Sequence, residues 1–451
     1  MDVFGSSGVR GVANEAVTPR LVLELAMAAG HVWGAERVAV ARDTRRTGPM
    51  LSDAAAAGLA SVGTTPERLG VLPTPGLQAH CEREGIPGLM VTASHNPPAF
   101  NGLKLVGADG IELSVADLEA IEETYLADEA AGVEWRSVGC GRPVDGARTE
   151  YVADLLGAVD RGVIADGNLT VALDPGHGAG CLTSPEFFRE LGCRVVTVHA
   201  QPDGSFPGRD PEPVNANLGD LKRLVAASDA DLGIAHDGDA DRAIFVDERG
   251  DYVEGDAALA ALAADALESG DVAVSAVNVS QRLVDVTEAV GADLSLTPIG
   301  STHLVTRIRS LQAEGRRVPI AGEGNGGIFF PERRLARDGA YTAARFLELV
   351  AERPASEVLA PYDDYVNLRE NVPYEDPTAR PAMMEAAAAF AADADGTVTE
   401  TDGYRIDYGD AWVLVRPSGT EPLVRLYAEA RERDRAAALL EAAHERLLAA
   451  R

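Results

Sequence analysis

The sequence has almost no lysine. Of its 451 residues only Lys104 and Lys222 are lysines, whereas 38 are arginines. Basic residues are also outnumbered: 71 acidic residues face 40 basic ones, which gives a formal net charge of -31 at pH 7. Because such a surface repels phosphate backbones, we expect no binding to nucleic acid.

The acidity also bears on the solvent in which the protein works. Scarce lysine, abundant alanine and a large negative charge are typical of proteins from extreme halophiles, where molar salt screens acidic surfaces. The composition therefore predicts adaptation to high salt. The alternative is an acidic enzyme of an ordinary organism.

Long hydrophobic runs and cysteine clusters are missing as well. No apolar stretch reaches the roughly 20 residues that span a bilayer, and residues 1–5 do not resemble a signal peptide. We therefore expect a cytoplasmic protein with no membrane contact. The four cysteines lack CxxC spacing, which predicts reduced thiols instead of a zinc site or disulfides.

Short apolar runs alternate with amphipathic patterns in three successive stretches, which predicts three similar α/β domains with parallel strands. The tail instead has strand patterns followed by a long helical pattern at 433–449, which predicts an α+β domain. Polar or charge-rich segments suggest domains at 1–140, 141–250, 251–362 and 363–451. The strands expected in the three stretches are 37–41, 88–94, 169–174, 194–200, 231–236, 272–277, 294–297 and 318–322.

Residues 91–104 carry the first feature with a chemical meaning. The apolar run Gly88–Val91 predicts a buried strand, and Pro97 and Pro98 discourage a helix after it. Ser94 is therefore expected on a stiff turn at a strand end, where α/β proteins build active sites. Lys104 follows ten residues later.

Three alternate carboxylates, Asp237, Asp239 and Asp241, follow the apolar run 232–235. Carboxylates on one short loop can converge on Mg²⁺ or Ca²⁺, which prefer oxygen ligands. An EF-hand is one alternative, but Arg242 stands where that loop needs glycine and both flanks have strand patterns. A solvated acidic turn is the other alternative.

Two more loops follow expected strands. Residues 322–327 bring Glu323 and Asn325, whose side chains suit sugar hydroxyls, although a flexible turn is the alternative. Residues 416–422 combine an arginine, two hydroxyls and a glycine, which can all serve a phosphate, although an ordinary turn is the alternative. Residues 4–11 and 41–45 add further arginine and hydroxyl clusters.

Taken in order, these loops resemble those of the α-D-phosphohexomutases, which include phosphomannomutase, phosphoglucomutase and phosphoglucosamine mutase. Residues 92–97 resemble the phosphoserine loop, 237–242 the metal loop, 322–327 the sugar-binding loop and 416–422 the phosphate-binding loop. The resemblance covers essentially the whole chain. It implies three mixed α/β sandwich domains and a TBP-like α+β domain around a central cleft.

The resemblance implies interconversion of hexose or hexosamine 1-phosphate and 6-phosphate. Ser94 would be a phosphoserine that donates its phosphoryl group, gives a sugar 1,6-bisphosphate and takes the other phosphate back. Mg²⁺ would be held by the phosphate on Ser94 and by Asp237, Asp239 and Asp241, where it offsets phosphoryl charge. An activator of the glucose 1,6-bisphosphate type is implied too.

The resemblance also implies further site residues. Lys104 and Arg10 match acid–base or electrostatic positions, and lysine can lose a proton that arginine keeps. His95 is expected to be structural or to orient the phosphate, because a neighbour of Ser94 on such a turn usually points elsewhere. The implied substrate-binding residues are Glu323, Asn325, Arg242, Gly300, Ser301 and His303. The implied phosphate-binding residues are Arg416, Ser418, Gly419, Thr420 and Arg425.

At two positions the sequence departs from bacterial members of the family, and these departures leave open which histidine, if any, assists proton transfer. Asn325, Gly326 and Gly327 stand where those members often have Ser-Gly-His, and Ser301 replaces a histidine, with His303 two residues on. The glycine-rich form resembles archaeal members. His177, in the turn at 174–180, is expected to be structural.

Two other functions stay open at this level. A metal-dependent phosphatase would use Ser94 as a nucleophile and release inorganic phosphate from glucose 1-phosphate. A non-catalytic binder of sugar phosphates would carry no phosphoserine. In every case the expected partners are small sugar phosphates, and the chain is expected to be a monomer or homodimer. The sequence does not predict which sugar is used.

Overall fold

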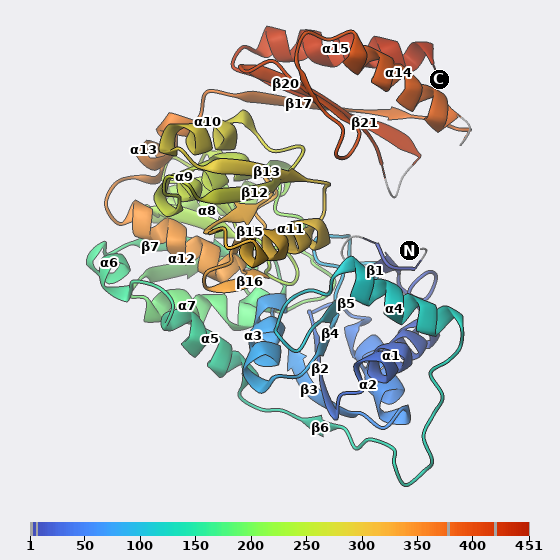
Figure 1. Cartoon of the computed structure of the whole chain (residues 1–451). Coiled ribbons are helices and arrows are strands. Elements are labelled where there is room, and N and C mark those ends of the chain that lie inside the picture. Colours follow the sequence, from blue (N-terminus) through green and yellow to red (C-terminus); the bar gives the residue numbers. More distant parts are fainter. Residues whose placement is uncertain (1–2, 6–7, 377–378, 419–421, 451) are drawn as a thin grey trace. The chain divides into compact units, whose positions relative to one another are not determined.

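The computed structural model describes residues 3–5, 8–376, 379–418 and 422–450. The chain divides into two compact units. The first consists of Met1–Ala258 and Asn325–Val358, and the second of Leu259–Gly324 and Leu359–Arg451. The chain therefore leaves the first unit, builds part of the second, and returns to the first before completing the second (Figure 1).

The first sheet belongs to the first unit. Its strands are β1 (Val9–Val12), β2 (Arg37–Arg42), β3 (Thr65–Val71), β4 (Gly88–Val91), β5 (Phe100–Val106) and β6 (Arg142–Pro143). They are ordered β1-β5-β4-β2-β3-β6. Strands β2, β3, β4 and β6 run parallel, and β5 is antiparallel to both β4 and β1.

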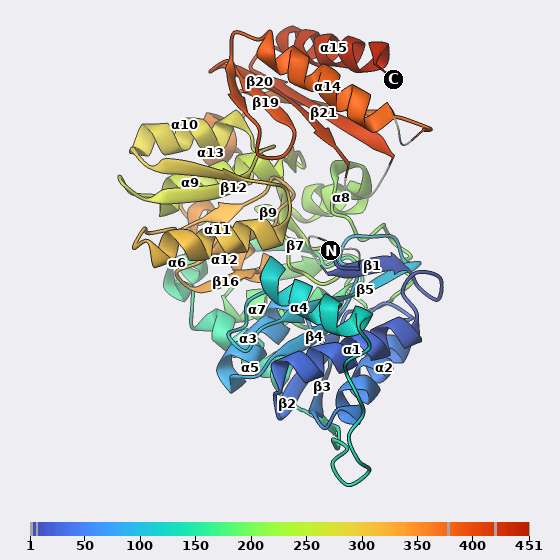
Figure 2. The ribbon, with the colours of Figure 1, turned by 45° about the vertical axis from the view of Figure 1, so that its right-hand side comes forward.

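Helix α1 (Pro19–Trp33) packs against both α2 (Gly48–Ser61) and α4 (Val115–Leu126) (Figure 2). It begins where the Thr18 hydroxyl accepts a hydrogen bond from the amide of Leu21, and it ends at Gly34, whose φ is 55°. These are the usual start and stop signals of a helix. Its apolar residues join the core of the first sheet.

The second sheet repeats this plan. It contains β7 (Thr170–Asp174), β8 (Arg194–Thr197), β9 (Leu232–Ala235), β10 (Ile244–Asp247) and β11 (Tyr252–Val253), in the order β11-β10-β9-β7-β8. Strands β7, β8 and β9 are parallel, and β10 is antiparallel to β9 and β11. The helices of this stretch are α5 (Ala147–Leu156), α6 (Arg161–Asp166), α7 (Ser184–Glu190) and α8 (Gly219–Ser228).

The second unit starts with a parallel group of strands. Strand β12 (Val272–Ala276) lies parallel to β13 (Asp293–Thr297) and to β14 (Ala321–Gly322). The helices here are α10 (Gln281–Val290) and α11 (Ser301–Ala313), and α9 (Gly255–Ala266) precedes them. The chain then returns to the first unit as an antiparallel pair, β15 (Ile328–Phe330) and β16 (Arg334–Arg337), followed by α12 (Gly339–Val350) and α13 (Ala355–Leu359).

The chain ends in an antiparallel sheet within the second unit. Its order is β17 (Val366–Pro373), β21 (Leu423–Ala430), β20 (Ala411–Pro417), β19 (Tyr404–Asp407) and β18 (Thr397–Thr399). Helices α14 (Ala379–Ala392) and α15 (Arg433–Ala449) cover one face (Figure 1). Apolar residues of both helices, such as Met383 and Leu447, form the core with the sheet.

A buried carboxylate organises the second unit. Glu429 on β21 is fully buried, and it accepts hydrogen bonds from the Ser280 hydroxyl (3.0 Å), the Gln281 amide (2.6 Å) and the Trp412 indole (3.1 Å). A negative charge at the start of α10 also suits the positive end of the helix dipole. This ties α10 to the C-terminal sheet.

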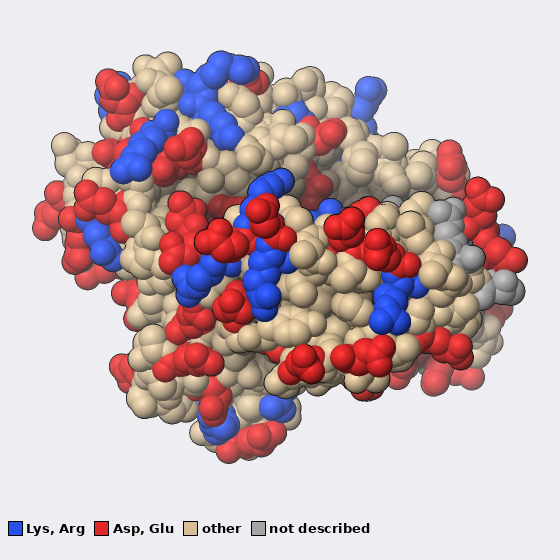
Figure 3. Space-filling view, turned by 90° about the horizontal axis from the view of Figure 1, so that it is seen from above, with Lys and Arg blue, Asp and Glu red and all other residues tan. Residues whose placement is uncertain are grey.

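Acidic side chains are spread over the face of the molecule shown in Figure 3, with basic side chains between them. Exposed arginines of the protein form ion pairs, such as Arg20 with Glu24 at 2.8 Å and Arg316 with Asp293 at 2.6 Å. Solvent-exposed pairs of this kind contribute little stability each.

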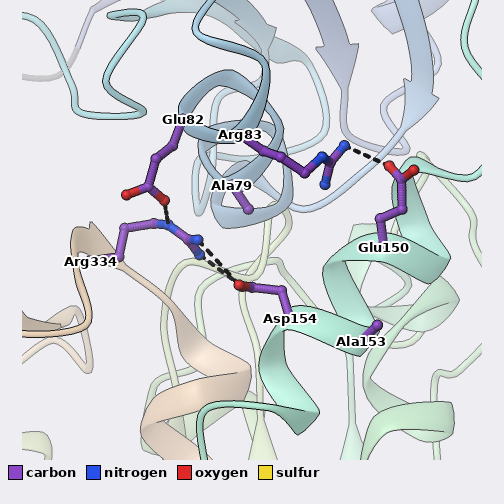
Figure 4. A pocket seen from close by; sticks show the side chains of 7 residues that line it. All are labelled: Ala79, Glu82, Arg83, Glu150, Ala153, Asp154 and Arg334. Atoms are coloured by element: carbon purple, nitrogen blue, oxygen red, sulfur yellow. Dashed lines mark hydrogen bonds and ion pairs between the residues drawn. The ribbon is translucent and has the colours of Figure 1, made fainter.

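Helix α3 (Thr74–Glu84), α5 and β16 meet at a pocket of about 450 Å³ in the first unit (Figure 4). Arg334 donates to Glu82 at 2.7 Å and to Asp154 at 3.0 Å. Arg83 donates to Glu150 at 2.6 Å. Segments far apart in the sequence line this pocket, and their charged side chains pair with one another.

The structure confirms the predicted fold class, with repeated mixed α/β sheets and an α+β end. All four cysteines are free, as expected. The strand expected at 88–94 is shorter and ends at Val91, because the chain turns there. Of the strand expected at 318–322, only Ala321 and Gly322 are in a strand, β14. No helix among the described residues is long and apolar enough to cross a membrane.

Candidate functional site

Ser94 lies on the turn directly after β4. It is 1% exposed and has a φ of 51°, a left-handed conformation that is uncommon for a residue with a side chain. Its amide donates to the Thr92 hydroxyl at 2.8 Å. The sequence prediction of a hydroxyl held on a stiff turn at a strand end is confirmed.

The three carboxylates follow β9 in the same unit. Asp237, Asp239 and Asp241 are all buried, and one carboxylate oxygen of each lies within 4.8 Å of those of the other two. The Ser94 hydroxyl donates to Asp237 Oδ2 at 2.6 Å. The fold therefore brings together two loops that are 143 residues apart in the sequence.

The burial and the flanks of this loop remove both alternatives considered for it. An EF-hand loop needs a helix on each side, but β9 and β10 flank these residues. A solvated acidic turn would expose its carboxylates, but none of the three is more than 1% exposed.

The donor set fits a divalent cation. One oxygen each of Asp239 and Asp241 is buried without a hydrogen-bond partner among the described residues. Burial, together with the charges of Asp239 and Asp241, raises the pKa of Asp237 to about 8. A cation bound by oxygen ligands would use the unpartnered oxygens and offset this repulsion.

Lys104 points into the same cluster. It lies on β5, opposite Met90 of β4, and its ammonium donates to Asp239 at 2.8 Å and to Asp241 at 2.9 Å. Burial disfavours its charge, but the two carboxylates outweigh burial and raise its pKa. The structure thus places Lys104 in the cluster in its protonated form.

Two members of the cluster were missed by sequence reasoning. Arg337 at the end of β16 donates to Asp241 at 2.8 Å, and Thr74 at the start of α3 donates to Asp239 at 2.5 Å. Neither lies in a loop with a distinctive composition. Their only sequence signal is their position at the end of one element and the start of another.

His95 is directed toward Ser94, contrary to the expectation that it points elsewhere. Its Nδ1 lies 3.3 Å from the Ser94 hydroxyl and accepts a hydrogen bond from Arg242 at 2.9 Å. The charge of Arg242 and burial lower the pKa of His95 to about 2. His95 is therefore neutral in this arrangement.

Arg10 approaches the same loop from β1. Its guanidinium donates to the Asn96 side chain at 3.5 Å, and its Nε is buried without a partner among the described residues. Burial lowers its pKa, although arginine remains charged. Arg10 and Arg242 therefore bring positive charge close to Ser94.

The remaining predicted residues fall into two groups. Asn325 belongs to the first unit, and its side chain accepts from the Gly327 amide at 2.9 Å. The second unit contains the other predicted residues that the structure describes: Glu323, Gly300, Ser301, His303, Arg416, Ser418 and Arg425. Glu323 is buried, Gly300 precedes α11, and Arg416 pairs with Asp402 at 2.9 Å. Gly419 and Thr420 lie outside the described residues.

Four family models match nearly the whole chain. They are phosphoglucomutase/phosphomannomutase alpha/beta/alpha domain I at residues 1–131, alpha/beta/alpha domain II at 149–250, alpha/beta/alpha domain III at 254–365, and the C-terminal domain at 370–446.

Similar proteins cover the chain from end to end. A phosphoglucomutase/phosphomannomutase of Thermococcus kodakarensis is 38% identical over 97% of both chains. A probable phosphoglucosamine mutase of Methanopyrus kandleri is 39% identical over 96% of this chain and 95% of that protein. A phosphoglucomutase/phosphomannomutase family protein of Burkholderia thailandensis has a similar crystal structure, with a TM-score of 0.86, 27% identity, and coverage of 99% of this chain and 97% of that one.

Proposed function

The chain belongs to the phosphoglucomutase/phosphomannomutase family and is a phosphohexomutase, and we propose that Ser94 is its phosphoryl carrier. In this proposal phosphorylated Ser94 exchanges its phosphoryl group with a sugar phosphate. The bond between phosphorus and Ser94 Oγ breaks as a bond between phosphorus and a free sugar hydroxyl oxygen forms, and the proton of that hydroxyl ends on Ser94 Oγ. The product is a sugar 1,6-bisphosphate. The other phosphoryl group then returns to Ser94, which completes a cycle between 1-phosphate and 6-phosphate.

The observation that carries this proposal is the contact between Ser94 and Asp237 at 2.6 Å inside a buried acidic cluster. A buried hydroxyl beside carboxylates and the cations Lys104, Arg10 and Arg242 is suited to hold and transfer a negatively charged group. We assign Arg10 and Arg242 the electrostatic role, and neutral His95 the orientation of the phosphate.

Asp237, Asp239 and Asp241 would hold Mg²⁺ together with an oxygen of the phosphorylated Ser94. When bound, the ion offsets the charge that spreads over the phosphoryl oxygens during transfer. The unpartnered oxygens of Asp239 and Asp241 support this assignment. A glucose 1,6-bisphosphate-type activator would restore the phosphoserine when the bisphosphate intermediate escapes.

For the sugar, we propose glucose, mannose or glucosamine phosphates, because the relatives carry the names of all three activities. Glu323 and Asn325 would hydrogen-bond sugar hydroxyls, assisted by Gly300, Ser301 and His303. Arg416, Ser418, Gly419, Thr420 and Arg425 would bind the phosphate that does not react. Comparing kcat/KM for the three sugar 1-phosphates in molar KCl would identify the preferred substrate.

One experiment tests the central proposal. Intact mass spectrometry of the purified protein should show one phosphoryl group, and the variant Ser94→Ala should lack it. Glucose 1-phosphate should give glucose 6-phosphate with little inorganic phosphate. Stoichiometric phosphate release would support the phosphatase alternative, and an unphosphorylated, inactive wild type would support the binding alternative. The names of the relatives favour neither alternative.

Lys104 gives a sharper test of proton transfer. We propose that it acts as the general acid or base, or orients the phosphoryl group. The variant Lys104→Arg keeps the positive charge but cannot give up its proton at working pH. We therefore expect kcat to fall by at least about 100-fold. A kcat near that of the wild type would remove Lys104 from this role.

A further inference from the structure

Arg45 holds the phosphoserine loop through four hydrogen bonds to its backbone and to the first residue of β5. Its side chain is fully buried, and its two terminal nitrogens donate to four backbone carbonyls. The acceptors are Ser94 at 2.8 Å, Asn96 at 2.7 Å, Pro97 at 2.7 Å and Phe100 at 3.0 Å.

Asp43 completes this arrangement from the same segment. Its carboxylate accepts from Arg45 Nε at 3.0 Å and from the Thr92 hydroxyl at 2.7 Å. The Thr92 hydroxyl in turn accepts from the Ser94 amide at 2.8 Å. Both backbone polar groups of Ser94, its N–H and its C=O, are therefore tied to the Asp43 and Arg45 pair.

The loop needs such support for two physical reasons. The positive φ of Ser94, 51°, is costly for a residue with a Cβ, so surrounding contacts must maintain it. Three of the four carbonyls lie in the turn between β4 and β5, the fourth belongs to Phe100 at the start of β5, and buried carbonyls need donors. A guanidinium supplies five N–H groups in a rigid fork, which a lysine ammonium cannot reproduce.

The far side of the guanidinium is closed by the second α/β stretch. The ring of Phe206 lies 5.2 Å from the guanidinium carbon, and Arg45 forms an isolated bridge with Gly204. A Cβ on Gly204 would lie 2.1 Å from the Thr44 carbonyl, so only glycine allows this approach. The side chain of Arg45 thus has little room for other conformations.

We propose that Arg45, together with Asp43, is a positioning pair that fixes the backbone of the phosphoserine loop, so that Ser94 Oγ stays directed at Asp237. This inference rests on the proposed role of Ser94. The hydrogen bonds of Arg45 to this loop are to backbone carbonyls and not to Ser94 Oγ, so the pair acts through the backbone of residues 94–100. Its loss should therefore impair transfer more than substrate binding.

The test compares Arg45→Lys with the wild type. We expect kcat to fall about 100-fold, because a displacement of roughly 1 Å at the reacting group costs that much. KM for the sugar phosphate should change by less than about threefold, since the binding residues are untouched. Phosphorylation of Ser94 by a sugar 1,6-bisphosphate, followed by intact mass spectrometry, should slow in parallel with kcat.

Arg282→Lys is the matched control. Arg282 is also buried and donates to backbone carbonyls, those of Tyr362 at 2.6 Å and Tyr365 at 2.7 Å, but it belongs to the second unit, whereas Ser94 belongs to the first. It should lower thermal stability and leave kcat unchanged. Should Arg45→Lys fail to fold, Thr92→Val leaves the four carbonyl contacts of Arg45 in place. It removes the hydroxyl that accepts from the Ser94 amide and donates to Asp43, and it should lower kcat with KM preserved.

The possible outcomes separate this inference from the proposed function. A wild type that neither carries phosphoserine nor interconverts sugar phosphates overturns both. An active wild type with unchanged kcat in Arg45→Lys, or in Thr92→Val if the former does not fold, overturns the positioning role alone. So does a loss that appears in KM instead of kcat, or an equal loss of kcat in Arg282→Lys.

Discussion

Asp237, Asp239 and Asp241 illustrate how burial controls chemistry at the scale of single residues. Lys104 donates to Asp239 at 2.8 Å, and Arg337 donates to Asp241 at 2.8 Å. Asp237 contacts the Ser94 hydroxyl and has the raised pKa. One oxygen each of Asp239 and Asp241 remains without a hydrogen-bond partner among the described residues, and a divalent cation would use these two oxygens.

Magnesium should accordingly stabilise the folded protein. Binding to the native state alone at 100 times Kd adds about 2.7 kcal/mol to the free energy of unfolding. We expect MgCl₂ to raise the thermal midpoint of EDTA-treated wild type but not that of Asp239→Asn. Asp247→Asn, which removes a buried carboxylate outside the cluster, serves as control and should keep the shift. An equal shift in Asp239→Asn would contradict the assignment.

A second residue-scale prediction concerns His199. Its hydrogen bond to Asp174 at 3.1 Å raises its pKa above the ordinary value, although burial opposes this. The native state therefore holds the proton more tightly than the unfolded state. The resulting stability is fully present below about pH 6.5 and is lost as pH rises through the raised pKa.

The measurement is a set of urea unfolding curves between about pH 6 and pH 8.5. The free energy of unfolding of the wild type should fall over this interval relative to that of His199→Gln, which cannot be protonated. Parallel curves for the two proteins would show that His199 does not contribute to the pH dependence.

At the scale of elements, helix ends and strand ends are determined mostly by local signals. Thr18 and Pro19 start α1, and Gly34 ends it. Thr18→Ala should lower the free energy of unfolding by about 1 kcal/mol, because the Leu21 amide loses its acceptor. Thr18→Ser keeps the hydroxyl and should cost less; equal losses in the two variants would contradict a capping role. Urea denaturation gives both values.

The elements that the sequence did not predict share a physical property: they bury polar residues. Helix α3 buries Gln78 and His80, which obscures an amphipathic pattern. Strand β5 buries Asn101 and Lys104, and β3 buries Glu67, which pairs with Arg37 at 2.9 Å. The partners of these three strand residues lie far along the chain, so the local sequence pattern does not identify the strands as interior.

At the scale of the whole molecule, the net charge of -31 is the dominant feature. Like charges destabilise the compact state, and salt shortens their range from about 10 Å at 0.1 M to about 3 Å at 1 M. The adaptation to high salt inferred from composition stays a prediction, as do the four domain limits.

KCl provides the test. Raising its concentration from about 0.1 M to about 2 M should raise the thermal midpoint by at least roughly 5 °C, because screening relieves the repulsion. Tetramethylammonium chloride at equal ionic strength should act similarly if screening is the cause. A midpoint that stays constant or falls with KCl would contradict adaptation to high salt.

The sequence by itself determined which polar residues each loop carries and the class of the fold, because both follow from local order: apolar runs that form strands, and polar residues placed at their ends. It therefore placed Ser94 and the three aspartates on turns after strands, in the order typical of the family. Only the tertiary structure decided which of these turns meet. The 2.6 Å contact of Ser94 with Asp237, the entry of Arg337 from β16 and the four carbonyls bound by Arg45 all depend on packing between segments far apart in sequence. Such distances depend on how side chains fill the space between elements, and no local pattern encodes them.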